Sequence, residues 1–141
     1  KYKYYDYVIK LIRNQNIDKY IAIHYRQSDF LKKRINRSDV LKDVDYLIKT
    51  CKEYMKQYDI SNVYIATDSK DENILIKLRN NLPLFFIQEY DNELTNEQNL
   101  HVIESCICIN SNVFIGTNSS CYSTFITSKR KCNNNTLNFY L

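Results

Sequence analysis

The stretch YIAIHYRQSDF, residues 20–30, changes from an apolar strand to a polar loop within a few positions. Tyr20–Tyr25 has the short, mostly apolar character of a strand that is covered on both faces. His24, Arg26 and Asp29 then place three ionisable groups where this strand should end. Open parallel sheets bind ligands outside the carboxyl ends of their strands. The stretch therefore predicts both a buried strand and a binding edge.

Outward from this stretch, helical and strand-like segments alternate along the chain. Apolar residues at helical spacing predict helices, and short apolar runs predict strands. We expect helices over Tyr5–Asn14, from Ser38 or Asp39 to about Met55, and over Asp71–Asn80, Glu97–Ile109 and Ser120–Ser128, with strands over Tyr20–Tyr25, Asn62–Ala66, Leu84–Ile87 and Val113–Ile115. This alternation predicts a single α/β domain over residues 1–141, with a Rossmann-like parallel sheet and helices on both of its faces.

The composition is that of a globular domain. The chain has 141 residues, of which 44% are hydrophobic and 26% charged, and its net charge is +4. This charge suits a phosphorylated small molecule, but it is too small and too evenly spread to indicate a nucleic-acid binder. Gly and Pro occur once each, so turns must use Asn, Asp and Ser.

The cysteines, the apolar runs and the tail limit the kinds of protein that the chain can be. The five cysteines contain no C-x-x-C spacing, so we expect mostly reduced thiols and no zinc site. No apolar run approaches the roughly 18 residues of a membrane span. The tail CNNNTLNFYL has no clear period, and its candidates for docking are Leu137, Phe139 and Tyr140.

Two further polar clusters fall at predicted strand ends. The strand VYIA is followed by Thr67 and Asp68, and the segment FIGTNSSCYS runs from a strand through the only glycine into a helix. Backbone N–H groups at a helix start favour an anion. Gly116 leaves room for backbone to approach a ligand. This second segment contributes Thr117, Ser119, Ser120 and Cys121 to the predicted edge.

Each of these residues also has a purely structural explanation. Arg26 can pair with Asp29 to hold a loop, and His24 can be a buried, satisfied histidine. Ser119, Ser120 and Asp68 can serve as helix caps, and Glu104 can lie on a solvated helix face. The sequence contains neither a recognisable metal-ligand set nor a nucleophile with its base. The convergence of three clusters on one edge is what favours a binding function.

Taken together and in order, the three clusters resemble the GDP-fucose-dependent fucosyltransferases, and most closely the protein O-fucosyltransferase and α1,6-fucosyltransferase group. The resemblance covers about residues 20–130. The family's motifs are H-x-R-x-x-D at a strand end, an apolar strand ending in A-T-D, and an acidic helix residue followed by a strand and a Ser-Ser turn. They are matched by His24, Arg26 and Asp29, by Ala66, Thr67 and Asp68, and by Glu104, Phe114–Thr117, Ser119 and Ser120, with Arg130 at the position of a later basic residue.

The resemblance implies the donor half of a two-domain, inverting glycosyltransferase of the GT-B kind. Arg26 would hold the diphosphate and stabilise the leaving GDP, with His24 beside it. Glu104 would read guanine, and the 117–120 turn would bind the phosphates. The remaining implied donor contacts are Asp29, Asp68 and Cys121. No metal or other cofactor is implied, the donor substrate is GDP-fucose, and the acceptor is a protein or glycan hydroxyl.

Several departures from the family pattern keep alternatives open. Gln27 and Ser28 replace the residues usual in the first motif, Glu104 is longer than the usual Asp, and Cys121 replaces an aromatic or small residue. An α1,2-fucosyltransferase-like enzyme and a non-catalytic nucleotide-sugar-binding module are the alternatives. A phosphatase or methyltransferase is disfavoured, because a nucleophilic Asp at the first strand end and a Gly-rich first loop are both missing.

Because the resemblance covers only the donor half of such enzymes, it implies that the chain is part of a two-domain enzyme, whose acceptor domain would precede Lys1. The sequence indicates neither oligomeric state nor compartment. The cytoplasm is one possibility, and the ER or Golgi lumen is the other if a preceding segment carries a signal or anchor.

Overall fold

A parallel sheet forms the centre of the domain. The computed structural model describes residues 5–25, 37–67, 71–86, 97–117 and 121–140, without the side chains of 37–43 and 97–99. Within these residues the strands β1 (Ile21–Tyr25), β2 (Val63–Thr67), β3 (Val113–Gly116) and β4 (Asn138–Tyr140) lie in the order β2-β1-β3-β4. All three pairings are parallel.

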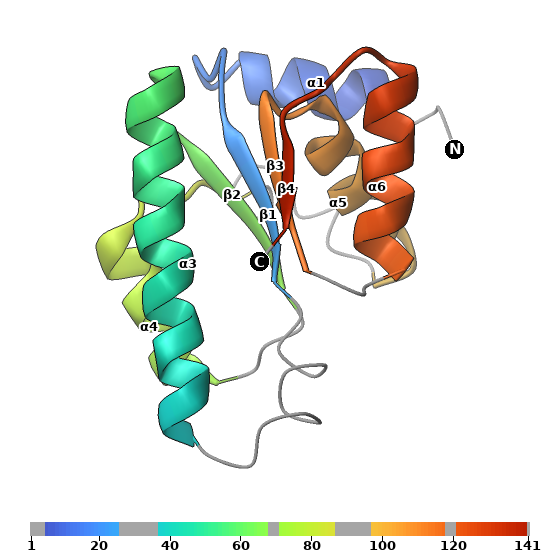
Figure 1. The fold of residues 1–141 in the computed structure, drawn as a ribbon. Helices are drawn as coiled ribbons and strands as arrows, with labels where there is room; N and C mark the ends of the chain where they lie inside the picture. Colours follow the sequence, from blue (N-terminus) through green and yellow to red (C-terminus); the bar gives the residue numbers. More distant parts are fainter. Residues whose placement is uncertain (1–4, 26–36, 68–70, 87–96, 118–120, 141) are drawn as a thin grey trace.

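Helices cover both faces of this sheet, as Figure 1 shows. The helices α3 (Arg37–Tyr58) and α4 (Glu72–Asn81) lie on one face, and α1 (Tyr5–Arg13), α5 (Glu97–Asn110) and α6 (Cys121–Cys132) lie on the other. The predicted α/β class and three of the predicted strands are therefore confirmed, with strand boundaries shifted by at most one residue.

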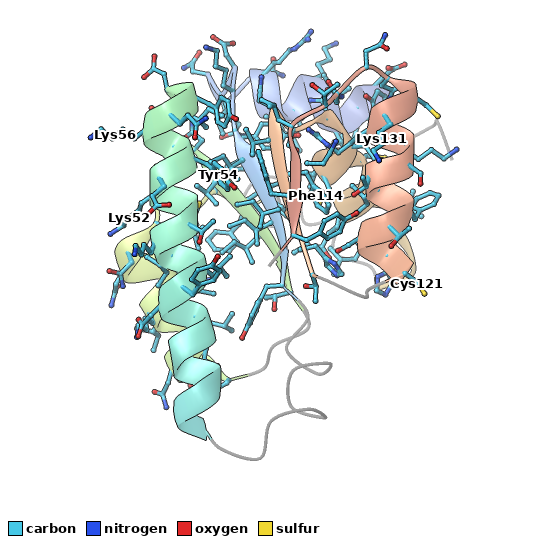
Figure 2. The ribbon with its side chains drawn as sticks, in the orientation of Figure 1. Lys52, Tyr54, Lys56, Phe114, Cys121 and Lys131 are labelled. Atoms are coloured by element: carbon cyan, nitrogen blue, oxygen red, sulfur yellow. The ribbon has the colours of Figure 1, made fainter. Side chains whose placement is uncertain are left out.

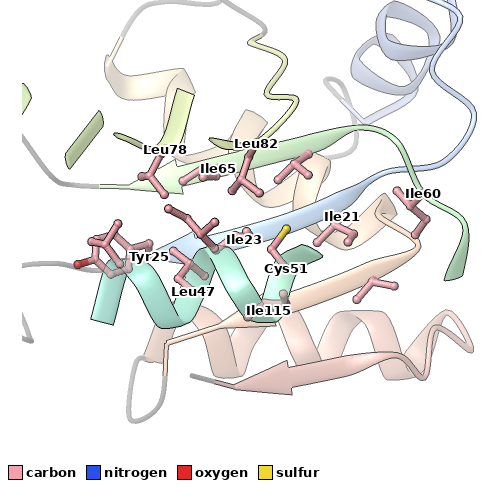
Figure 3. Close-up of a cluster of buried hydrophobic side chains, with 14 of the residues drawn as sticks. Ile21, Ile23, Tyr25, Leu47, Cys51, Ile60, Ile65, Leu78, Leu82 and Ile115 are labelled. Carbon is pink, nitrogen blue, oxygen red and sulfur yellow. The ribbon is translucent and has the colours of Figure 1, made fainter. Parts of the chain in front are cut away.

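Strand side chains alternate between two cores because successive residues of a strand point to opposite faces. Ile21, Ile23 and Tyr25 of β1 pack with Leu47 and Cys51 of α3, a cluster drawn in Figure 3. The other cluster contains Ala22 of β1, Tyr64 of β2 and Phe114 of β3, with residues of α1, α5 and α6. Both faces of β1 are buried, which explains its nearly continuous apolar sequence.

Asn and Asp replace glycine at the ends of three helices. Among the described residues, Asn16, Asp59 and Asn134 have positive φ, at 62°, 54° and 64°. They follow α1, α3 and α6, where a left-handed residue commonly ends a helix. Asn and Asp tolerate this conformation better than other non-glycine residues. The expectation that Asn and Asp would form the turns is confirmed at these positions.

One predicted strand is wrong, and the tail forms a strand where the sequence predicted no element. The expected strand Leu84–Ile87 is reduced in the described residues to one parallel bridge, between Leu84 and Val63, and Ile87 lies outside them. After this bridge the ring of Phe85 packs edge-on against Tyr20, with ring centroids 5.4 Å apart. The tail forms strand β4 in a parallel ladder with β3. The expected docking is confirmed for Leu137 and Phe139, which pack against the core.

The side chain of Arg130 on α6 is fully buried and joins several elements. It donates hydrogen bonds to the carbonyls of Cys108 (3.1 Å) and Ile109 (3.2 Å), in the last turn of α5. Further bonds reach Ser111 before β3, the carbonyl of Leu137 and the side chain of Asn138. A cation at a helix C-terminus satisfies unpaired carbonyls and complements the helix dipole.

These contacts place the Arg130 guanidinium at the amino ends of β3 and β4, opposite the predicted binding edge. Arg130, which the resemblance places at the position of a later basic residue of the family, therefore has a structural role in this domain. Burial lowers the pKa of Arg130 to about 10, so the group stays charged at neutral pH.

Replacing Arg130 with Met should strongly destabilise the domain. The substitution keeps an apolar stem but leaves several buried carbonyls without donors, and each such loss costs about 1–3 kcal/mol. We expect a decrease of about 3 kcal/mol or more in the free energy of unfolding, measured by urea denaturation. The exposed neighbour Lys131 provides the matched control, and Lys131→Met should change stability by less than about 0.5 kcal/mol. Equal effects of the two substitutions would contradict the role given to Arg130.

Candidate functional site

The strand order creates a switch point between β1 and β3. From β1 the chain first moves to β2 on one side and later returns to β3 on the other side. The connections leaving β1 and β3 therefore run over opposite faces of the sheet. In open α/β sheets, a crevice at the carboxyl ends of two such strands is the usual ligand site. His24 and Thr117 lie at this place, within β1 and directly after β3.

One hydroxyl connects these two strand ends to α6. The Oγ atom of Ser123 lies 2.7 Å from His24 Nδ1 and accepts a hydrogen bond of 2.9 Å from the backbone N–H of Thr117. The Thr117 hydroxyl donates to the carbonyl of His24 at 2.7 Å. His24, Thr117 and Ser123 are all buried, with 8%, 2% and 0% exposure. The three residues form a closed network that fixes the first turn of α6 against the sheet.

The network shows which hydrogen-bonding groups of His24 and Thr117 have partners inside the protein. His24 Nδ1 faces Ser123, and the imidazole ring lies 4.7 Å from the ring of Tyr122. Thr117 uses both its N–H and its hydroxyl within the domain, so we assign it a positioning role in place of direct phosphate binding. The structural explanation given above for His24 is realised, with the histidine at the edge of the switch point.

Gly116 is required by helix packing, which corrects the expectation that it makes room for a ligand. A Cβ atom added at Gly116 would lie 2.8 Å from Ser123 Oγ, 2.9 Å from Ser123 Cβ and 3.0 Å from Phe114 Cε2. The glycine φ is not positive, so backbone strain is not the reason for this residue. The absence of a side chain lets α6 approach β3 closely enough for the Ser123 bonds to form.

Substituting Gly116 with Ala should displace Ser123 and weaken the network. Overpacking a close contact costs about 1–3 kcal/mol, which exceeds the few tenths to about 1 kcal/mol gained from a stiffer unfolded chain. We expect a lower free energy of unfolding, measured by urea denaturation. Ser123→Gly removes both clashing atoms, so a double-mutant cycle should show that Gly116→Ala costs less in that background. Additive effects of the two substitutions would contradict this packing explanation.

The first turn of α6 lies at the same edge as the switch point. Cys121 is the exposed first residue of this helix, and Figure 2 shows it at the end opposite Lys131. The N–H groups of a helix start carry a partial positive charge and favour anions. Five predicted site residues lie outside the described residues: Arg26, Asp29, Asp68, Ser119 and Ser120. Asp68 is a candidate helix cap by sequence, but the N-cap of α4 is Asp71, whose side chain accepts a hydrogen bond from the N–H of Asn73.

Glu104 of α5 lines a cavity of about 250 Å³ beside the carboxyl end of β2. Thr67, Arg79 and Phe86 also line it, and the Arg79 guanidinium lies 4.8 Å from the centre of the Phe86 ring. Glu104 is partly buried and accepts a 3.0 Å hydrogen bond from the hydroxyl of Tyr64. The alternative of a solvated helix face is therefore wrong for Glu104.

The surroundings of Glu104 change its protonation. Burial raises the pKa of its carboxyl to about 7, and the hydrogen bond from Tyr64 opposes this rise. A carboxyl near half-ionisation at neutral pH, held in a cavity, is a candidate for a functional group. Nucleobases offer N–H donors that an ionised carboxylate can accept in pairs.

Sequence reasoning assigned no role in this region to Tyr64, Tyr122 or Ser123, although Tyr122 and Ser123 lie within the FIGTNSSCYS segment. Tyr64 is a strand residue without any motif of its own. Ser123 is recognisable only through the spatial approach of α6 to Gly116. A second cavity, of about 500 Å³, lies between α1, α5 and α6 and includes Tyr5 and Phe125, but no strand end contributes to it.

Two further features concern only the residues that the structure describes. No group of three or more His, Cys, Asp and Glu side chains there is arranged to hold a metal ion. In the same residues, no helix combines the length and the apolar character needed to cross a bilayer.

Comparison with known proteins relates this arrangement to one family. The family model for GDP-fucose protein O-fucosyltransferase matches residues 5–133. The GDP-fucose protein O-fucosyltransferase 2 of Caenorhabditis elegans is 26% identical over 113 residues, which cover 79% of this chain and 26% of that protein.

Solved structures show the same fold. Crystal structures of POFUT1 in complex with GDP and with GDP-fucose superpose with TM-scores of 0.65 and 0.64, each at 13% identity. The superpositions cover 96% of this chain and 46% and 45% of the POFUT1 chains. The chain thus spans less than half of these structures and about a quarter of the curated relative.

Proposed function

Because the chain belongs to the GDP-fucose protein O-fucosyltransferase family, we propose that its β1–β3 switch point binds the GDP portion of GDP-fucose for fucosyl transfer. The observation that carries this proposal is the Ser123 network. It holds the end of β1, the residue after β3 and the start of α6 together at one edge. Arg26 directly follows the last residue of β1, and Ser119 and Ser120 directly precede α6.

The proposed contacts divide the nucleotide between two neighbouring regions. The diphosphate is bound by the Arg26 guanidinium, by the hydroxyls of Ser119 and Ser120 and by the N–H groups that start α6 at Cys121. An Arg fork matches phosphate oxygens, and Asp29 orients that fork. His24 and Asp68 complete the donor contacts near the sugar and ribose. Glu104 accepts the ring N–H and amino group of guanine in the adjacent cavity.

The chemistry of transfer explains the need for a fixed cation. As the bond between the sugar and GDP breaks, negative charge develops on the departing phosphate and positive charge on the sugar ring. The acceptor hydroxyl oxygen forms the new bond on the opposite face of the ring, which inverts the configuration, and the hydroxyl proton is released to solvent. In this proposal Arg26 stabilises the departing phosphate, and no metal ion is needed. Removing one such electrostatic contact typically costs a rate factor on the order of 100 or more.

We further propose that residues 1–141 form the donor half of a two-domain enzyme. The match to less than half of each POFUT1 chain supports this division. The acceptor, a protein or glycan hydroxyl, would then meet the donor at a surface shared with the other half. The chain departs from the α1,2-fucosyltransferase pattern at its second motif, Thr67-Asp68-Ser69.

Isothermal titration of the chain with GDP, ADP and UDP tests the proposal directly. We expect GDP to bind at least about tenfold more tightly than either alternative, because one bidentate base contact is worth about 1–3 kcal/mol. Arg26→Ala should weaken GDP binding at least about tenfold without lowering the melting temperature. Arg26→Lys should restore little, since a point charge does not reproduce the fork.

Two results would contradict this proposal. Equal affinities for the three nucleotides would remove Glu104 from the site. A folded chain without measurable GDP affinity would favour a non-enzymatic domain that serves as a binding or structural module.

A further inference from the structure

We propose that Tyr64 is a positioning residue for base selection, whose hydroxyl holds the Glu104 carboxylate in the orientation that guanine requires. The inference rests on the proposed function of the same site and adds to it the residue that sets its selectivity. Tyr64 lies on β2 and Glu104 on α5, so the contact joins the sheet to the helix that carries the base-reading group.

The Tyr64 side chain is held in a fixed position. It is 4% exposed, and its ring lies 5.5 Å from the ring of Phe85, which in turn packs against Tyr20. Its backbone is paired in register with Ala22 of β1. Because the ring is held in place, the Tyr64 hydroxyl has a fixed position. Glu104, by contrast, has a flexible side chain that gains a defined orientation from the 3.0 Å hydrogen bond.

The geometry of a carboxylate allows both contacts at once. An ionised carboxylate has two oxygens with about four acceptor positions. Tyr64 donates to Oε2 and so occupies one of these positions. Three positions remain, and guanine needs one on each oxygen for its ring N–H and amino group. The Tyr64 contact therefore orients the carboxylate without blocking base recognition.

The ionisable groups around Glu104 make Tyr64 the group that most directly favours its charged form. Tyr122 of α6 and Cys108 of α5 are buried neutral groups whose pKa values are raised by burial. Arg79 of α4 lines the same cavity, and His24 of β1 lies beside Tyr122. A hydrogen bond to the charged form of an acid lowers its pKa. Loss of the Tyr64 hydroxyl should thus raise the pKa of Glu104 above about 7.

The experiment measures the ratio of GDP to ADP affinity by isothermal titration between pH 5.5 and 8.5. Both nucleotides carry the same diphosphate, so its ionisation cancels in the ratio. Only ionised Glu104 accepts both guanine donors, so in the unaltered chain the ratio should rise with pH through a midpoint near 7. Tyr64→Phe should move this midpoint up by about one pH unit and lower the ratio at pH 7 about fivefold.

Tyr20→Phe provides a matched control for Tyr64→Phe. Tyr20 is a buried tyrosine that packs on the same Phe85, and its hydroxyl donates to the carbonyl of Ile107 on the same helix α5. The Tyr20→Phe variant should be less stable but should keep the same pH midpoint of the affinity ratio. Glu104→Gln should make the ratio independent of pH. Glu104→Asp withdraws the carboxylate from Tyr64 by one methylene and should shift the midpoint upward, which provides a second test if Tyr64→Phe does not fold.

The outcomes separate this inference from the proposed function. Absence of a GDP preference in the unaltered chain at every pH would overturn the proposed function itself. A clear GDP preference with the same midpoint in the unaltered chain and in Tyr64→Phe, or in Glu104→Asp if that variant alone folds, would overturn the role of Tyr64 and leave the proposed function intact. An equal shift in Tyr20→Phe would also overturn it, because the effect would then come from general loosening of α5.

Discussion

The hydroxyl of Ser123 is the constraint on which the candidate site depends. It faces the imidazole of His24 and accepts from the backbone of Thr117, so one atom holds the ends of β1 and β3 and the first turn of α6. The contact exists because residue 116 has no side chain. The only glycine of the sequence therefore serves a packing function that indirectly builds the binding edge. The packing of α6 at Gly116 thus determines the geometry of the proposed binding edge.

The amino ends and the carboxyl ends of the strands differ in the polar groups that they hold and in what those groups do. At the amino ends of β3 and β4, the buried Arg130 guanidinium satisfies carbonyls of α5 and ties down the tail. At the carboxyl ends, polar groups remain close to a cavity and to a helix start. A charged residue near a strand is thus informative only when its edge is known. Arg130 and Glu104 illustrate this, because neighbouring helices carry them to opposite ends of the same sheet.

The sequence predicts the parallel sheet well because its strands are short apolar runs between periodic helices. It also predicts that His24 and Thr117 meet, because the carboxyl ends of parallel strands share an edge. It does not predict β4, since Asn138–Tyr140 becomes a strand through its tertiary pairing with β3. Nor does it reveal the Tyr64–Glu104 contact, which joins residues 40 positions apart on a strand and a helix without any local signal.

Hydrogen exchange of the chain with and without GDP, followed by mass spectrometry, tests the central claim most directly. The claim is that the nucleotide binds at the carboxyl ends of β1 and β3, against the start of α6. The account predicts slower exchange in peptides that contain residues 21–29 and 113–124, with unchanged exchange in the segment from the end of α6 through β4. Protection confined to the cavity between α1, α5 and α6, or to the edge that holds Arg130, would contradict it.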